Sequence, residues 1–196
     1  MNPEAEGPYA TAGAFVGVGQ GRFVFATGPR RQGDALGIVR LGGHVEDGET
    51  PWECAARELG EEACLRAVER LEPPRTYRQP FGGGQWGPLE GMHWERARGP
   101  APLVLKSGPQ ALSVLYLART GEAPVPASEI RALIFLTPAE IRTLIQEAHS
   151  LERFLENGGK VRFNPRHAFD RALPLRPSSD LAAFVQIAAE HPEIMR

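Results

Sequence analysis

Three glutamates in one short segment have the residue types and the spacing of a divalent-metal site. Glu58, Glu61 and Glu62 follow a glycine pair, Gly42-Gly43. At about 100° per helical residue, the three side chains lie within an arc of about 100°. Like charges at this spacing repel each other, whereas a hard cation such as Mg²⁺ favours converging carboxylate oxygens. Two interpretations follow from the residues: a solvated acidic face with Arg57 paired to Glu61, or a metal site.

The element that positions these glutamates is a strongly signalled helix. Thr50 is a natural N-cap, Pro51 suits the first helical position, and Glu53 completes a Thr-x-x-Glu capping box. Apolar residues then recur at helical spacing on the face opposite the glutamates. They are Trp52, Ala55, Ala56, Leu59 and Ala63. This face is expected to pack on a sheet.

Outside this segment, apolar runs and turn residues predict a mixed β-sheet with helices packed on it. Residues 14–18 and 22–26 predict a hairpin around Gly19-Gln20-Gly21. Further extended segments are expected at 36–41 (ended by Gly42-Gly43), 65–72, 76–79, 112–118 and 130–136, and helices over 137–155 and Ser179–Glu190. Residues 81–106, rich in Gly and Pro, predict a long ordered loop or hairpin insert. The elements together predict an α/β sandwich.

The spacing around the glutamates resembles a known family signature. Gly43, Glu49, then Arg57-Glu58-Leu59 and Glu61-Glu62 fall where the Nudix box of Nudix hydrolases has its fixed residues, over Gly43 to Leu65. Residues 135–141 resemble the family's late strand-to-helix junction. The resemblance implies an α/β/α sandwich with a mixed β-sheet. It also implies a Nudix domain over residues 1–156, followed by an extension, 157–196, with one helix packed on it.

The resemblance implies metal ligands residue by residue. Glu61 and Glu62 would be the principal ligands, helped by Glu58 and by a backbone carbonyl of Gly42 or Gly43. The metal would be Mg²⁺, with Mn²⁺ as the alternative. Such ions bridge diphosphate oxygens and activate the attacking water.

The resemblance also implies supporting and catalytic roles. Arg57 would orient a glutamate of the box through a charge-assisted hydrogen bond, and Glu49 would hold the loop-helix junction through Arg57. The general base would be either Glu58 or a glutamate of a later loop, for which Glu129 is the candidate. A surface loop position is the equal alternative for Glu129. Weaker candidates for the base are Glu122 and Glu90.

Two positions depart from the family's pattern. Cys64 stands where the box usually has a glycine, and a side chain there penalises a left-handed helix cap. A somewhat different helix exit is therefore expected, with the ligands intact and Cys64 packed. Arg40 stands where a proline is common, and its guanidinium could reach a phosphate.

The substrate is less well specified than the reaction. The resemblance implies cleavage of a phosphoanhydride bond in a nucleoside diphosphate derivative. Pro80 lies near an offset typical of ADP-ribose pyrophosphatases, in a stretch that is proline-rich throughout. Trp86 and Trp94 of the insert could stack on a base or could equally anchor the loop. The alternative function is a Nudix-fold nucleotide-binding or sensing module that does not hydrolyse.

Composition limits the partners. The chain has 196 residues with a formal net charge of −2, which does not favour nucleic acid as a partner. Cys54 and Cys64 form no metal-ligand or disulfide pattern. No apolar run is long enough to span a bilayer and no signal peptide is evident, so a cytoplasmic protein is expected. The apolar face of Ser179–Glu190 suggests either a homodimer or packing on its own domain.

Overall fold

The computed structural model describes residues 9–79, 86–89, 100–107, 112–127 and 129–195. Its strands are β1 (Tyr9–Gly17), β2 (Phe23–Pro29), β3 (Leu36–Val39), β4 (Leu41–His44), β5 (Val68–Leu71), β6 (Tyr77–Gln79), β7 (Gly87–Pro88), β8 (Val104–Ser107), β9 (Leu112–Thr120), β10 (Ala132–Leu136), β11 (Lys160–Phe163) and β12 (Leu175–Pro177). Its helices are α1 (Pro51–Ala63), α2 (Pro138–Gln146), α3 (Leu151–Glu156), α4 (Ser179–Glu190) and a final 3₁₀ turn, η2 (Pro192–Met195).

The strands form one mixed sheet with the order β11-β10-β2-β1-β9-β8-β6-β7. Strands β3, β4, β5 and β12 pair at branches of this order. The long β1 and β9 are parallel, whereas β1 pairs antiparallel with β2 and with β4. The chain therefore leaves β2 through β3 and crosses to β1 at β4. This crossing brings Gly42 and Gly43 beside the centre of the sheet.

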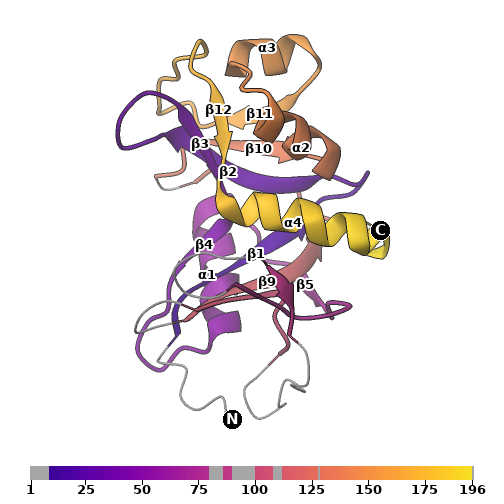
Figure 1. The fold of residues 1–196 in the computed structure, drawn as a ribbon. Helices are drawn as coiled ribbons and strands as arrows, with labels where there is room; N and C mark the ends of the chain where they lie inside the picture. The colour runs from indigo at the N-terminus through magenta and orange to yellow at the C-terminus, as the bar shows by residue number, and fades with distance from the viewer. Residues whose placement is uncertain (1–8, 80–85, 90–99, 108–111, 128, 196) are drawn as a thin grey trace.

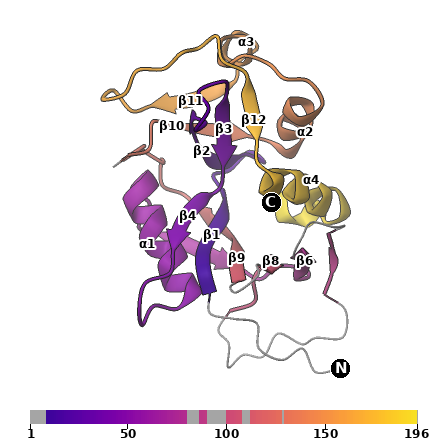
Figure 2. The ribbon, with the colours of Figure 1, turned by 60° about the vertical axis from the view of Figure 1, so that its left-hand side comes forward.

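Helix α1 covers one face of the sheet, as Figures 1 and 2 show. Its buried residues are Pro51, Cys54, Ala55, Leu59 and Ala63. Trp52 packs edge-on against Tyr116 of β9, with ring centroids 5.3 Å apart. The predicted capping box is present, because the Thr50 and Glu53 side chains each accept from the other's backbone N–H. The helix that carries the glutamates is thus fixed at its start and along its apolar face.

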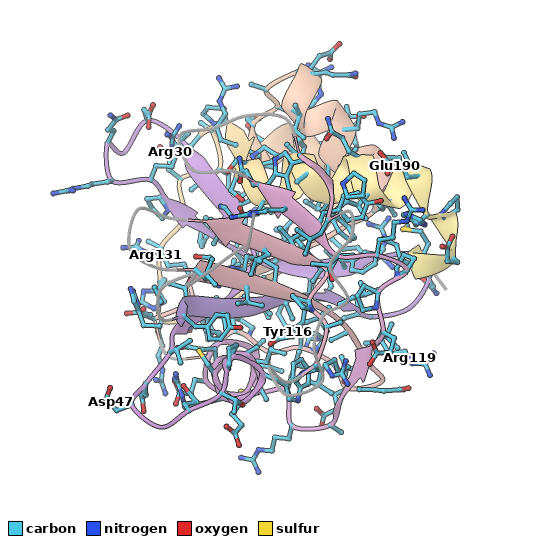
Figure 3. The ribbon with its side chains drawn as sticks, turned by 60° about the horizontal axis from the view of Figure 1, so that its bottom comes forward. Arg30, Asp47, Tyr116, Arg119, Arg131 and Glu190 are labelled. Atoms are coloured by element: carbon cyan, nitrogen blue, oxygen red, sulfur yellow. The ribbon has the colours of Figure 1, made fainter. Side chains whose placement is uncertain are left out.

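Helices α2 and α4 cover the opposite face, so the layers are helix, sheet and helix (Figure 3). Phe184 of α4 stacks on Phe15 of β1 with centroids 4.4 Å apart and meets Phe23 of β2 edge-on. The apolar face of α4 suggested either a dimer or packing on its own domain, and in the structure it packs on its own domain. The predicted α/β/α sandwich with a mixed sheet is confirmed.

The chain after Glu156 adds to this same sheet. Strand β11 pairs antiparallel with β10, and β12 pairs parallel with β3. Together with α4, these strands place the C-terminal segment in the core of the domain. No helix of the described part of the chain is long and apolar enough to cross a membrane.

The predicted single helix over 137–155 is wrong. Helix α2 stops at Gln146, because Glu147 turns to an extended conformation with φ −130° and ψ 120°. Ser150 then caps α3 by accepting from the Arg153 N–H, and its backbone pairs with Pro174. The pairing with a residue distant in sequence interrupts a helix that local propensity would continue. The last helical residue, Glu156, lies one residue beyond the predicted end at 155.

Two other predicted boundaries are also wrong. The segment 36–41 is two strands, and the glycine pair expected to break it lies within β4 instead. The expected loop or hairpin insert at 81–106 ends in strand β8, whose Val104 and Leu105 are fully buried between β6 and β9. Residues 80–85 and 90–99 of that insert lie outside the described part of the chain.

Candidate active site

The glycine pair brings the backbone of β4 against two glutamates of α1. Gly42 has φ +135°, and a side-chain carbon on it would overlap the carbonyl oxygen of Ala12. Its N–H donates to Oε2 of Glu62 over 2.8 Å. A side-chain carbon on Gly43 would overlap the carboxylate of Glu58. Gly42 therefore requires glycine, whereas a side chain at Gly43 would displace the Glu58 carboxylate. Each of the two positions holds a glutamate of the helix close to the strand.

Arg57 connects the loop before α1 to the glutamates on the helix. Its Nε donates to Glu49 over 3.0 Å, and its Nη1 donates to Glu58 over 3.0 Å and to Glu61 over 3.2 Å. Its Nη2 donates to the carbonyl oxygen of His44 over 3.0 Å. The hydrogen bond with Glu49 contributes most to raising the pKa of Arg57 above its ordinary value. The guanidinium is therefore a permanent cation that orients three carboxylates.

Glu62 lies where burial and neighbouring carboxylates disfavour its negative charge. Burial is the largest cause that raises the pKa of this carboxyl from 4.5 to about 7. The charges of Glu58 and Glu129 raise it further, while the Gly42 N–H and Arg40 lower it. Three carboxylates from α1 and from the segment before β10 thus act on one region. A cation there would relieve both the burial and the repulsion.

The donor set fits a hard cation, although the glutamates are not gathered around one point. Among the described residues, no group of three or more His, Cys, Asp or Glu side chains is arranged to hold a metal ion. Glu58 and Glu61 instead contact Arg57, and the Glu61 side chain is 56% exposed. Carboxylate and carbonyl oxygens are nevertheless the ligands that Mg²⁺ prefers. The Glu58 carboxylate lies close to Gly43, and the use of a backbone oxygen as a ligand stays a prediction.

Arg40 lies beside the glutamates but is used internally. Its Nη1 donates to the carbonyl oxygen of Ala12 over 3.3 Å and its Nη2 to the hydroxyl of Thr11 over 3.3 Å. Burial lowers the pKa of Arg40, and Asp180 at the start of α4 is its strongest anionic neighbour. These contacts fasten β4 to β1, while the expected reach of Arg40 to a phosphate stays a prediction.

Trp86 of the insert is not brought to the glutamates. Trp86 is partly buried against the core on the α4 side of the sheet, whereas α1 covers the other side. Trp94 and Glu90 lie outside the described residues. Glu122 is also engaged elsewhere, because its carboxylate accepts the backbone N–H groups of Arg66 and Ala67.

Glu129 lies at a cavity of about 540 Å³ on the α1 face of the sheet. Arg30, Arg131 and His167 also line this cavity, and sequence reasoning did not single them out. Arg131 lies two residues after Glu129, just before β10. Arg30 and His167 gave no signal, since only the fold brings their segments together.

Cys64 adopts the left-handed conformation that its position in the box suggested for glycine. Its φ is 55° and its ψ is 29°, and its N–H bonds the carbonyl oxygens of Gly60 and Leu59. The expectation of a different helix exit is therefore wrong, since the helix ends with the usual geometry on an unusual residue. The expectation of a packed thiol is also wrong, because Cys64 is exposed while Cys54 is buried.

The chain matches a known domain family and is similar to several solved structures. Residues 8–157 match the NUDIX domain family. Solved structures with a similar fold include a NUDIX-family hydrolase from Clostridium perfringens (TM-score 0.45, 20% identity, 69% of this chain and 84% of the other). Others are the E. coli ORF135 protein (0.46, 18%, 95% and 95%) and a C. elegans Ap4A hydrolase (0.42, 15%, 66% and 81%). No curated protein matches the sequence.

The sandwich and the glutamate helix beside a glycine pair define a hydrolase of the Nudix type. The chain belongs to the NUDIX domain family, since the match spans residues 8–157 of its 196. The predicted family, fold class and enzyme class are thereby confirmed.

Proposed function

We propose that this Nudix hydrolase cleaves a phosphoanhydride bond in a nucleoside diphosphate derivative, with Mg²⁺ or Mn²⁺ bound by Glu58, Glu61 and Glu62. The observation that supports this most is the set of carboxylates around Glu62. Burial and the neighbouring charges of Glu58 and Glu129 raise its pKa to about 7. A buried carboxyl group with a strongly raised pKa is typical of a functional site.

The protein's residues perform separable tasks in this proposal. Arg57 orients Glu58 and Glu61 from one side, and Gly42 fixes Glu62 through its N–H. Gly43 leaves space for the Glu58 carboxylate beside the strand. When bound, the metal supplies positive charge for the diphosphate oxygens and lowers the pKa of the attacking water. Glu61 would have to turn from Arg57 to become a ligand, and its exposure permits this.

Glu129 and Glu58 remain the two candidates for the general base. Glu129 is exposed at the cavity and close enough to affect the ionisation of Glu62. Glu58 is largely buried and bonded to Arg57, which suits a role as ligand. We therefore favour Glu129 as the base. Glu129→Gln should then lower kcat by about 10²-fold or more with Mg²⁺ affinity retained.

A substrate panel with Mg²⁺ tests the reaction. It contains ADP-ribose, dinucleoside polyphosphates, nucleoside triphosphates, nucleotide sugars, NADH and coenzyme A, with phosphate and monophosphate release measured. Turnover of at least one member is expected, and it should disappear in Glu61→Gln and in Glu62→Gln with folding retained. Unchanged turnover in both variants would contradict the assignment of the metal site.

The alternative is a binding or sensing module with the same fold. No turnover of any panel member, together with nucleotide binding by calorimetry, would support this alternative. The glutamates of the signature are all retained, which favours hydrolysis.

A further inference from the structure

The cavity beside Glu129 has a floor of glycine and walls of arginine. Gly28 of β2 and Gly37 of β3 are cross-strand partners in this floor. The aliphatic stem of Arg131 lies next to Gly28, and that of Arg30 lies next to Gly37. We call this space the arginine cavity and define it by Arg30, Arg131 and the two glycines. The two glycines leave room for these arginine stems, and guanidinium groups offer paired donors to oxyanions.

Both arginines are available to a ligand. Each is exposed, and neither has an ion pair or a side-chain hydrogen bond to any described residue. Figure 3 shows Arg30 and Arg131 on the same side of the molecule, which is also the side of Asp47 in the loop before α1. Other arginines near the sheet are engaged, since Arg57 and Arg119 contact glutamates. Arg30 and Arg131 therefore place two unpaired guanidinium groups on the side of the molecule that carries the loop before α1.

A third wall comes from the chain beyond the matched family region. Asn164 is 5% exposed and donates from its side chain to the carbonyl oxygen of Ile130. Its backbone N–H bonds the carbonyl oxygen of Arg131, and its own carbonyl accepts from the His167 N–H. This buried residue fixes the loop that carries His167 against the segment carrying Glu129 and Arg131. The cavity is thus a built feature of the fold.

The residues that line the arginine cavity suit a phosphoryl group better than a nucleotide base. Among the described lining residues there is no Phe, Tyr or Trp on which a base could stack, and the imidazole of His167 is the one aromatic ring. Glu129 is the one acidic residue described in the lining, and its segment reaches α1, because the Ala127 N–H bonds the carbonyl oxygen of Glu62. A phosphoryl group held by the two arginines would therefore belong to a molecule whose other end reaches the glutamates.

We propose that the arginine cavity binds a phosphoryl group remote from the scissile bond. The enzyme would then prefer substrates that carry an additional phosphate over substrates with a neutral remote end. The preference among substrates rests on the proposed function. The binding of phosphate by Arg30 and Arg131 stands independently of turnover.

Binding is tested first without catalysis. Inorganic tripolyphosphate is titrated by calorimetry, without added metal, into wild type, Arg30→Gln, Arg131→Gln and the double variant. Each single change should weaken binding by about tenfold, because each removes a charge-assisted contact. Arg142→Gln is the matched control, since Arg142 is an exposed arginine of α2 in another layer. It should bind as wild type does. Equal affinity in wild type and the double variant would overturn the proposal.

Turnover then tests specificity. A panel substrate with a remote phosphate is compared with one that lacks it. Arg131→Gln should raise KM about tenfold for the first and leave KM of the second within twofold, with kcat near wild type for both. An equal change for both substrates would overturn the specificity claim. If nothing is hydrolysed but tripolyphosphate binding depends on the arginines, the proposed function fails and the phosphate site stands.

Discussion

Replacing Cys64 by glycine should stabilise this enzyme. Cys64 is the C-cap of α1 and has φ 55° and ψ 29°, a left-handed conformation. Its side chain is exposed, so shortening it removes no packing in the core. The hydrogen bonds at the cap are made by its backbone N–H and remain available to glycine. The substitution therefore isolates the backbone strain of one residue.

The magnitude follows from two opposing terms. A side chain in the left-handed region costs roughly 1–2 kcal/mol. Glycine offsets about 0.5–1 kcal/mol of the gain from relieving this strain, because it has more conformational freedom in the unfolded chain to lose on folding. The free energy of unfolding should rise by about 0.5–1 kcal/mol, which corresponds to an increase in Tm of about 1–4 °C for a chain of this size.

The assay is urea unfolding and thermal unfolding of wild type, Cys64→Gly and Cys64→Ala. The alanine variant removes the thiol but keeps the Cβ, so its stability should stay close to that of wild type. A gain of the same size in both variants would refute the argument from backbone strain and would point to the thiol. A loss of stability in Cys64→Gly would refute it as well.

Gly43→Ala should lower kcat at least tenfold, because the added carbon would overlap the Glu58 carboxylate and displace it. An unchanged kcat would show that Glu58 can move without loss of activity and would contradict this prediction. Arg57→Lys should lower kcat by about 10–100-fold, since one ammonium cannot contact Glu49, Glu58 and Glu61 together; full activity would contradict its orienting role. Without metal, stability should fall as pH rises from 4.5 to about 7, because the folded state keeps a proton on Glu62 that the unfolded chain has released. The loss is about 1–3 kcal/mol after solvent screening, and Glu62→Gln should flatten this part of the stability profile.

Local signals in the sequence predicted the parts of the fold that local interactions determine. The helix α1 begins where Thr50, Pro51 and Glu53 predict it, since capping is encoded within a few residues. The break between α2 and α3 was missed, because it depends on the pairing of Ser150 with Pro174. Strand β8 was missed for the same reason, as its place between β6 and β9 is a tertiary choice within a segment rich in Gly and Pro.

The candidate site, like the fold, has parts that local sequence signals predicted and parts that depend on the tertiary structure. Spacing on one helix was enough to gather Glu58 and Glu62 on the same side of α1 and to place Arg57 beside Glu58. The internal partners of Arg40 could not be predicted, because no local pattern shows that β4 crosses to β1. The cavity formed with Arg30 and His167 required the fold, since it joins segments far apart in the chain.

The central claim is metal-dependent hydrolysis by the glutamates of α1. The most direct test measures monophosphate release from the substrate panel against Mg²⁺ concentration, for wild type and Glu62→Gln side by side. Saturable Mg²⁺-dependent release by wild type, with release by Glu62→Gln reduced by at least about 10²-fold, is the predicted result. Release that is independent of Mg²⁺, or equal in the two proteins, would contradict the claim.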